Sequence, residues 1–179
     1  MLSPSDILQR RIEEALTDLV SLPIWGTCRA LNMQMFDLGK CRTTVNAKGK
    51  RVEVSEYSLH IQCPWRIVGP EGIIVGSEDR NYPEDEESDW SEFDPDGPTR
   101  SEARISGWLE QHEESPLVVD SVEANHVGGF KLFLSKGFVL EVFPAHSLRG
   151  ETCDYWRLIR PSEGASHFVV TGHGIEDDV

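Results

Sequence analysis

The chain has few of the features by which a small protein reveals its chemistry, beginning with cysteine. Its four cysteines form no C-x-x-C pair and lie far apart, at positions 28, 41, 63 and 153. In a chain of 179 residues, such scattered cysteines are typical of reduced cytosolic thiols rather than of a disulfide framework or a zinc ribbon. The opening residues, MLSPSDILQRR, contain no apolar signal segment, so we expect a cytoplasmic protein.

Basic residues and long apolar runs are also scarce. The chain has 17 Lys and Arg residues against 31 Asp and Glu residues, a formal net charge of −14. Phosphate contacts require clustered Lys and Arg, so we expect no binding to nucleic acid or to anionic membrane surfaces. The longest apolar runs have the length of a strand, which predicts no membrane-spanning helix. The acidity either serves solubility alone or attracts a basic protein partner.

Catalytic motifs are missing as well. The sequence contains neither G-x-S-x-G nor H-E-x-x-H. Its glycine-rich pieces do not make a phosphate loop, because Gly128-Gly129 precedes a strand-like segment and Gly172-His173-Gly174 precedes no helix. We therefore predict no catalytic residue and no cofactor, and we favour a protein that is not an enzyme.

Two segments have only a partial likeness to metal sites. The spacing of His60 and Cys63 in a strand places them on opposite faces, which argues against a shared metal ion. The segment Asp94–Gly97 is similar to part of a calcium loop, but Ala103 stands where such a loop requires glutamate. We predict no metal site, and adventitious calcium binding at most.

What the sequence does contain is a series of short alternating apolar segments. The clearest signal is the segment 130–143, where two apolar runs flank Lys136-Gly137. β-branched and aromatic residues on both sides of a two-residue turn predict a β-hairpin, and its apolar residues on both faces predict a central place in a sheet. Further strands are predicted by Trp25–Leu38, Val52–Val68, Gly72–Ser77, Leu117–Ala124, Tyr155–Ile159 and His167–Thr171.

Two segments carry the signals of helix starts. Ser3 can cap a helix whose first position is Pro4, and the apolar stripe that follows predicts a helix over 4–22. Thr99 and Glu102 form a capping box, which predicts a second helix over 100–113. The predicted fold is a single α+β domain over residues 1–179, with a mostly antiparallel sheet around the 130–143 hairpin.

Acidic residues crowd one interval, which we call the acidic loop (residues 79–98). Like charges and few apolar residues predict a long mobile loop there, although Trp90 and Phe93 could anchor it. The residues proposed to contact a basic partner are Glu84, Asp85, Glu86, Glu87 and Asp89.

Polar residues also recur in the middle of predicted strands. A charge in such a place must be paired, and Glu141 is expected to pair with Arg157 or with Arg66. The set forms either a salt-bridged sheet face or a small-ligand or catalytic pocket. Its members are His60, Gln62, Arg66, Glu141, Arg157 and His167.

Several long segments resemble those of a widespread family of uncharacterised bacterial proteins. They are SLPIWGTCRALNMQMFDLG, SLHIQCPWRIVGPEGIIVGSEDRNYP, VDSVEANHVGGFKLFLSKGFVLEVFP, YWRLIRP and HFVVTGHGIE. The resemblance spans nearly the whole chain and implies a bacterial, intracellular, stand-alone domain, without implying any catalytic residue. Some members are similar to the small acidic immunity proteins of bacterial toxin systems.

Three hypotheses for function follow. The favoured one is an acidic, non-enzymatic interaction protein, an immunity-like binder of a basic partner. The second is a ligand-binding protein or enzyme that uses the polar sheet face. The third is a homo-oligomeric structural domain without a small ligand.

Overall fold

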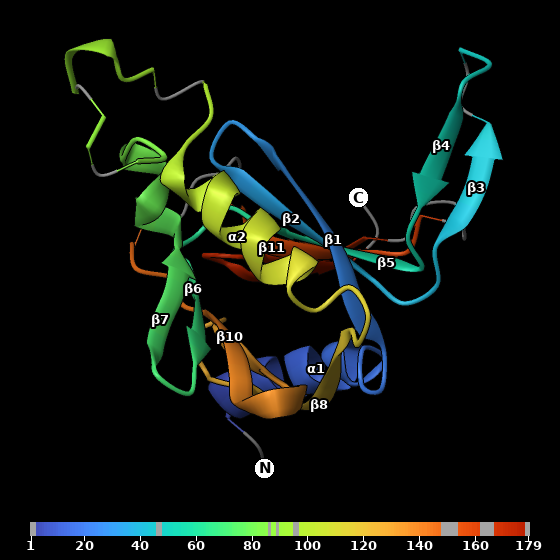
Figure 1. The fold of residues 1–179 in the computed structure, drawn as a ribbon. Coiled ribbons are helices and arrows are strands. Elements are labelled where there is room, and N and C mark those ends of the chain that lie inside the picture. Colours follow the sequence, from blue (N-terminus) through green and yellow to red (C-terminus); the bar gives the residue numbers. More distant parts are fainter. Residues whose placement is uncertain are drawn as a thin grey trace.

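The computed structural model describes residues 3–45, 48–85, 87–88, 90–94, 97–147, 154–161 and 167–177. They form two α-helices, a large antiparallel sheet and a separate two-stranded ribbon (Figure 1), which confirms the predicted α+β class. The elements are α1 (Pro4–Thr17), β1 (Pro23–Ala30), β2 (Met33–Leu38), β3 (Arg42–Val45), β4 (Arg51–Val54), β5 (Tyr57–Ile61), β6 (Trp65–Gly69), β7 (Gly72–Gly76), α2 (Arg100–Glu110), β8 (Leu117–Ala124), β9 (Phe130–Leu134), β10 (Phe138–Val142), β11 (Asp154–Ile159), β12 (His167–Thr171) and β13 (Gly174–Asp177), with short 3-10 turns at Ser77–Asn81, Trp90–Glu92 and Ser135–Gly137.

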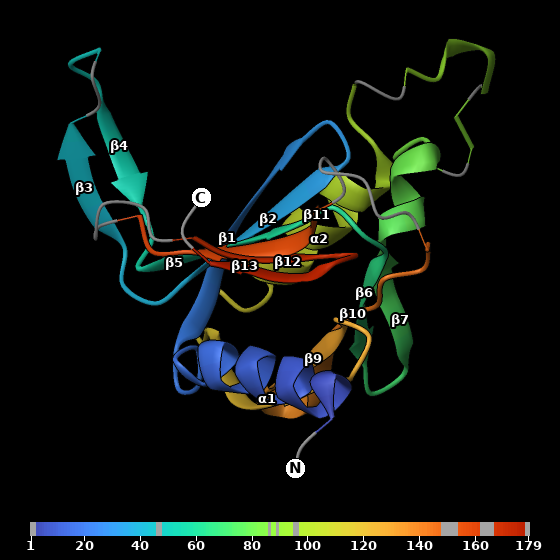
Figure 2. The same ribbon diagram turned by 180° about the vertical axis from the view of Figure 1, so that it is seen from behind.

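The large sheet is bent into two halves. Its strand order is β13-β12-β11-β5-β2-β1-β8-β9-β10-β6-β7 among the described residues. Strands β1 and β8 are joined only by the pairs Pro23–Val118 and Ile24–Leu117, whereas neighbouring strands within each half pair more extensively. Figures 1 and 2 show the half from β8 to β7 turning steeply away from the half from β13 to β1.

One core fills the space between the two halves and the helices. Phe130 on β9 and Trp156 on β11 meet edge to face across the halves, with ring centroids 4.8 Å apart. The indole Nε1 of Trp156 also donates to the carbonyl of Gly128 at 2.8 Å. Helix α1 packs against β8, and α2 packs against β7 and β1. The apolar side chains that the helices bury completely in this core are Ile12 and Leu16 of α1 and Ile105 of α2.

Both predicted helix starts are confirmed, and both helices end earlier than predicted. Ser3 and Asp6 form a capping box at α1, and Thr99 and Glu102 form another at α2. Helix α1 ends at Thr17 rather than at residue 22, because the following residues form tight turns that lead into β1. Helix α2 ends at Glu110 rather than at residue 113, because the chain tightens there and the N–H of His112 donates to the carbonyl of Leu109.

The predicted hairpin at 130–143 is confirmed. Strands β9 and β10 pair antiparallel, and Lys136 and Gly137 take φ angles of 63° and 79° in the turn. Both strands have neighbours on both sides, and Leu140 is fully buried. The hairpin is therefore internal, although it lies nearer to the β7 edge than to the middle of the strand order.

Three strand boundaries differ from the prediction. The segment Trp25–Leu38 is not one extended strand but the hairpin β1–β2, which turns at Leu31 with a φ of 56° and no glycine. The segment Val52–Val68 is divided into β4, β5 and β6, and at Pro64 the chain crosses from β5 in one half of the sheet to β6 in the other. The residues after Gly172 form an additional edge strand, β13, which pairs with β12.

Candidate functional site

The six polar residues proposed from the sequence do not come together in one site. His60, Arg157 and His167 lie on β5, β11 and β12 in one half of the sheet, whereas Arg66 and Glu141 lie on β6 and β10 in the other. Gln62 follows β5, is half-buried and donates its backbone N–H to the carbonyl of Tyr155 at 2.9 Å. The proposed single polar face is thus two separate clusters.

The first cluster is centred on His60. Its Nε2 lies 3.1 Å from the hydroxyl of Ser58, and Arg157 is its cross-strand neighbour on β11. Burial is the main cause that lowers the pKa of His60; the charges of Arg157 and His167 lower it further, and Asp37 opposes them. The imidazole is therefore favoured in its neutral form, as a histidine half-buried beside a cation should be.

This cluster does not have the geometry of a nucleophile with an activated base. The Ser58–His60 contact supplies the first two members of such an arrangement, but a third group must orient the imidazole. The Asp37 carboxylate instead accepts a hydrogen bond from the Ser55 hydroxyl at 2.6 Å. Arg157 donates to the Asp154 carboxylate, so the cluster is a hydrogen-bonded face of the sheet.

The second cluster is a cross-strand ion triad. The Glu141 carboxylate lies 2.5 Å from Arg66 Nε and 2.8 Å from Lys131 Nζ, and the three residues are direct neighbours across β6, β10 and β9. The hydrogen bond from Lys131 is the main cause that lowers the pKa of Glu141; Arg66 lowers it further, and burial opposes both. Glu141 therefore pairs with Arg66, one of its two expected partners. Its negative charge is compensated by Arg66 and Lys131 together.

The triad borders a shallow pocket of about 300 Å³ that also contains Asn125 and Phe143. The Arg66 guanidinium lies over the Phe143 ring, 5.5 Å from its centroid. Lys131 was not among the residues proposed from the sequence. The predicted hairpin register could have found it, because that register places Lys131 directly opposite Glu141.

The acidic loop contains a small aromatic cluster. The rings of Tyr82 and Trp90 lie 5.5 Å apart, and those of Trp90 and Phe93 lie 6.1 Å apart. Pro83 is buried and bridges to Thr99, so both ends of the loop meet at the start of α2. Trp90 is 56% exposed and Tyr82 is 43% exposed.

Exposed carboxylates occupy the same loop as these rings. Glu84, Asp85 and Glu87 are all exposed, and none of the three forms an ion pair with a described residue. Glu86 and Asp89, which the sequence also suggested as contacts, lie outside the described residues. The loop thus combines exposed aromatic rings with unpaired negative charge.

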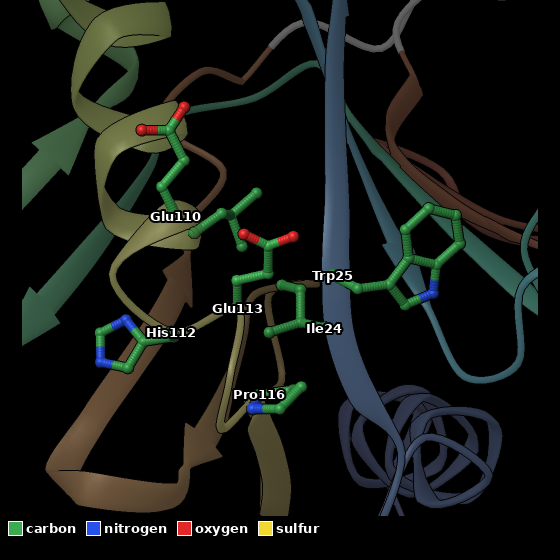
Figure 3. Close-up of a pocket in the computed structure, with 7 residues that line it drawn as sticks. Ile24, Trp25, Glu110, His112, Glu113 and Pro116 are labelled. Carbon is green, nitrogen blue, oxygen red and sulfur yellow. The ribbon is translucent and has the colours of Figure 1, made fainter.

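A second acidic feature lies at the other end of α2. A pocket of about 440 Å³ opens between the end of this helix and β1. Figure 3 shows the carboxylate of Glu113 in the space between α2 and β1, close to Ile24, whereas the side chain of Glu110 extends along α2 and Trp25 lies on the far side of the strand. His112 turns back toward the helix, where its Nδ1 lies 2.7 Å from the carbonyl of Trp108.

The end of α2 favours a cation on electrostatic grounds. Its last turn contains no basic residue, and the carboxylates of Glu110 and Glu113 stand near the negative end of the helix dipole. The sequence reasoning missed this feature. The acidic run Glu110–Glu114 at a predicted helix end, without a Lys or Arg, was the signal that could have found it.

No family model matches the chain, and no curated protein or solved structure is significantly similar to it. The resemblance to a family of bacterial proteins therefore stays a prediction. Within the described residues, no group of three His, Cys, Asp or Glu side chains is placed to hold a metal ion. No described helix is both long and apolar enough to cross a membrane.

Proposed function

We propose that the protein is a non-catalytic binding protein that recognises a basic protein partner through an acidic face. This face consists of the acidic loop and the acidic end of α2. The observation that carries the proposal is the exposed Tyr82–Trp90 pair in a loop that also presents the exposed carboxylates of Glu84, Asp85 and Glu87. Exposed aromatic anchors with a charged rim are typical of protein interfaces.

The two parts of the acidic face are close enough for one partner. Helix α2 has 11 residues, so its ends are about 16 Å apart, within the span of a standard interface of roughly 800 Å² per partner. Figure 1 shows the loop at one end of α2 and the turn toward β8 at the other. The exposed Arg104 lies on the helix between them, and Arg100 is partly exposed at the start of the helix, so cations interrupt the acidic surface.

The two clusters on the sheet support binding rather than catalysis as the activity. In the ion triad the charge of Glu141 is matched by Arg66 and Lys131, and in the first cluster Asp37 bonds to Ser55 rather than to His60. A catalytic site needs a nucleophile, an acid–base pair or a metal whose neighbours tune it. An immunity-like role requires only a shaped and charged surface.

The test compares capture by two variants of equal charge. The acidic-loop variant is Glu84→Gln/Asp85→Asn/Glu87→Gln, and the control variant is Glu53→Gln/Asp120→Asn/Glu123→Gln, which removes three exposed charges elsewhere. Wild-type protein immobilised on a resin should retain a specific basic protein from native lysate at low salt, and mass spectrometry identifies it.

The expected outcome is that the control variant retains the same protein and the acidic-loop variant retains much less. Trp90→Ala should also lose it, because an exposed aromatic anchor contributes on the order of 2 kcal/mol or more to an interface. Equal retention by all variants, or a retained partner that is acidic, would contradict the proposal. If light scattering shows a stable homo-oligomer that Trp90→Ala dissociates, the result would instead support a homo-oligomeric structural domain.

A further inference from the structure

Half of the histidines in the chain line one pocket on the α1 side of the molecule. The pocket has a volume of about 580 Å³, and its histidines are His126, His146 and His173. They come from the β8–β9 loop, the segment after β10 and the β12–β13 turn, respectively. Helix α1, whose first turn also lines the pocket, lies in front in Figure 2, whereas α2 lies in front in Figure 1. We call this pocket the histidine pocket.

The lining of the histidine pocket contrasts with the rest of the protein. None of the thirteen lining residues that the structure describes is Asp or Glu, in a chain whose net charge is −14. Its polar side chains include the hydroxyl-bearing Ser5, Ser147 and Tyr155. The pocket therefore offers hydrogen-bond donors and imidazoles in a chain that has an excess of carboxylates.

Hydrogen bonds order the backbone of the segments that carry the three histidines. The Asn125 side chain accepts the N–H groups of Val127 and Gly129, both at 3.0 Å, and so fixes the loop that carries His126. The His146 carbonyl accepts the Tyr155 hydroxyl at 3.1 Å, and the two rings meet edge to face. The N–H of His173 donates to the Thr171 hydroxyl at 3.1 Å.

The geometry favours an anion over a metal ion. The three imidazoles line the same pocket, but they do not form a group placed to share one metal among the described residues. Imidazoles that bind protons near neutral pH become donors with positive charge, which attract oxyanions. The positive end of the helix dipole of α1, at Pro4 and Ser5, adds to this attraction.

One negative group stands close to the pocket. The Asp6 carboxylate accepts a hydrogen bond from the backbone N–H of Ser3 at 3.1 Å; Ser3 is the main cause that lowers the pKa of Asp6, and His126 lowers it as well. Asp6 thus already offsets part of any charge on His126. His146 and His173 lie beyond this pairing and are the main candidates for contact with an added anion.

We infer that the histidine pocket binds a small molecule through a phosphate group. A tetrahedral phosphate can accept from several imidazoles and hydroxyls at once, and the pocket volume lies within the range of about 300–1,000 Å³ typical of small-ligand sites. The titratable groups that line the pocket are His126, His146, His173 and Tyr155, and Asp6 lies close to His126. An imidazolium donates a charge-assisted hydrogen bond that a neutral imidazole cannot supply, so we expect acidification to strengthen phosphate binding.

The test is isothermal titration of the full chain with inorganic phosphate and with glycerol phosphate, near pH 6 and near pH 7.5. The His146→Gln/His173→Gln variant removes two donors of the pocket. His167→Gln, at the opposite end of β12, is the matched control, and circular dichroism confirms that all variants fold.

The expected result is binding that is tighter near pH 6, unchanged in the control and weaker by about tenfold or more in the double variant, because charge-assisted hydrogen bonds are lost. Tighter binding of glycerol phosphate than of inorganic phosphate identifies an organic phosphate as the ligand class, and the reverse identifies free phosphate. Absence of binding near pH 6, equal binding by the double variant, or zinc binding that needs the histidines while phosphate does not bind would each overturn the inference.

Discussion

The rings of Tyr82 and Trp90 meet edge to face, with centroids 5.5 Å apart and ring planes at 81°. Both residues belong to an acidic segment in which like charges repel one another, so this contact opposes the spreading of the loop. Because both rings also remain largely exposed, they serve two purposes in the proposed function. They organise the acidic loop, and they present an aromatic surface to a partner.

The acidic loop should contain the first site of limited proteolysis. Few apolar residues of the loop are buried, so little offsets its conformational entropy. A glutamate-specific protease should cleave first after Glu84 or Glu87, and Trp90→Ala should accelerate this cleavage several-fold. Leu31→Ala, at an exposed position of the β1–β2 turn, should leave the rate unchanged. A first cut elsewhere inside the chain would show that the loop is not the least stable region.

Leu140 should contribute strongly to stability. Its side chain is fully buried on β10, so Leu140→Ala should lower the free energy of unfolding by about 2–5 kcal/mol through lost burial and a residual cavity. Ile73 lies on the edge strand β7 and is 62% exposed, so Ile73→Ala should lower the free energy of unfolding by less than about 1 kcal/mol. Urea denaturation followed by fluorescence measures both, and equal losses would contradict the assigned core.

The ion triad should make stability depend on acidic pH. The pKa of Glu141 is lowered in the folded protein, above all by the hydrogen bond from Lys131, relative to about 4.3 in the unfolded chain. The stabilisation is therefore present above about pH 4.3 and is lost as the pH falls through the lower, folded value. The stability gap between wild type and Glu141→Gln should be constant near neutral pH and shrink below about pH 4. A gap that grows on acidification would contradict this pairing.

The described thiols should differ sharply in reactivity. Burial raises the pKa of Cys63 to about 12, and its side chain is buried, so it offers almost no accessible thiolate. Cys28 and Cys41 are exposed residues, although partial desolvation of the sulfur raises the thiol pKa of each. In a Cys153→Ser background, a thiol reagent near pH 8 should modify Cys28 and Cys41 in the folded protein. Cys63 should react only after denaturation, and rapid modification of the folded protein at Cys63 would contradict its burial.

Local signals in the sequence were sufficient for much of the fold. The capping residues Ser3 and Thr99 located both helix starts, and Lys136-Gly137 located the hairpin, because caps and tight turns depend on a few adjacent residues. The turn at Leu31 was not predictable in this way, since a leucine with positive φ is an exception to the usual backbone preference. The bend between the halves depends on the distant β1–β8 pairing.

Less of the candidate site could be predicted from the sequence. Glu84, Asp85 and Glu87 could be found because a run of like charges is visible without a structure. The division of the polar strand residues into two clusters was not visible in the sequence. At Pro64 the chain passes from one half of the sheet to the other, and this crossing separates His60 from Arg66. The histidine pocket depends on loops that meet only in the folded chain.

The most direct test of the central claim is the association rate of the captured partner as a function of salt. Exposed charges are screened over about 8–10 Å near physiological ionic strength, so steering by the acidic face must weaken as salt is added. We predict that the wild-type and control-variant rate constants fall by roughly tenfold or more between low and high salt. We predict that the acidic-loop variant associates slowly at low salt and depends little on salt. A rate constant that is the same for all three proteins and insensitive to salt would contradict the proposed acidic face.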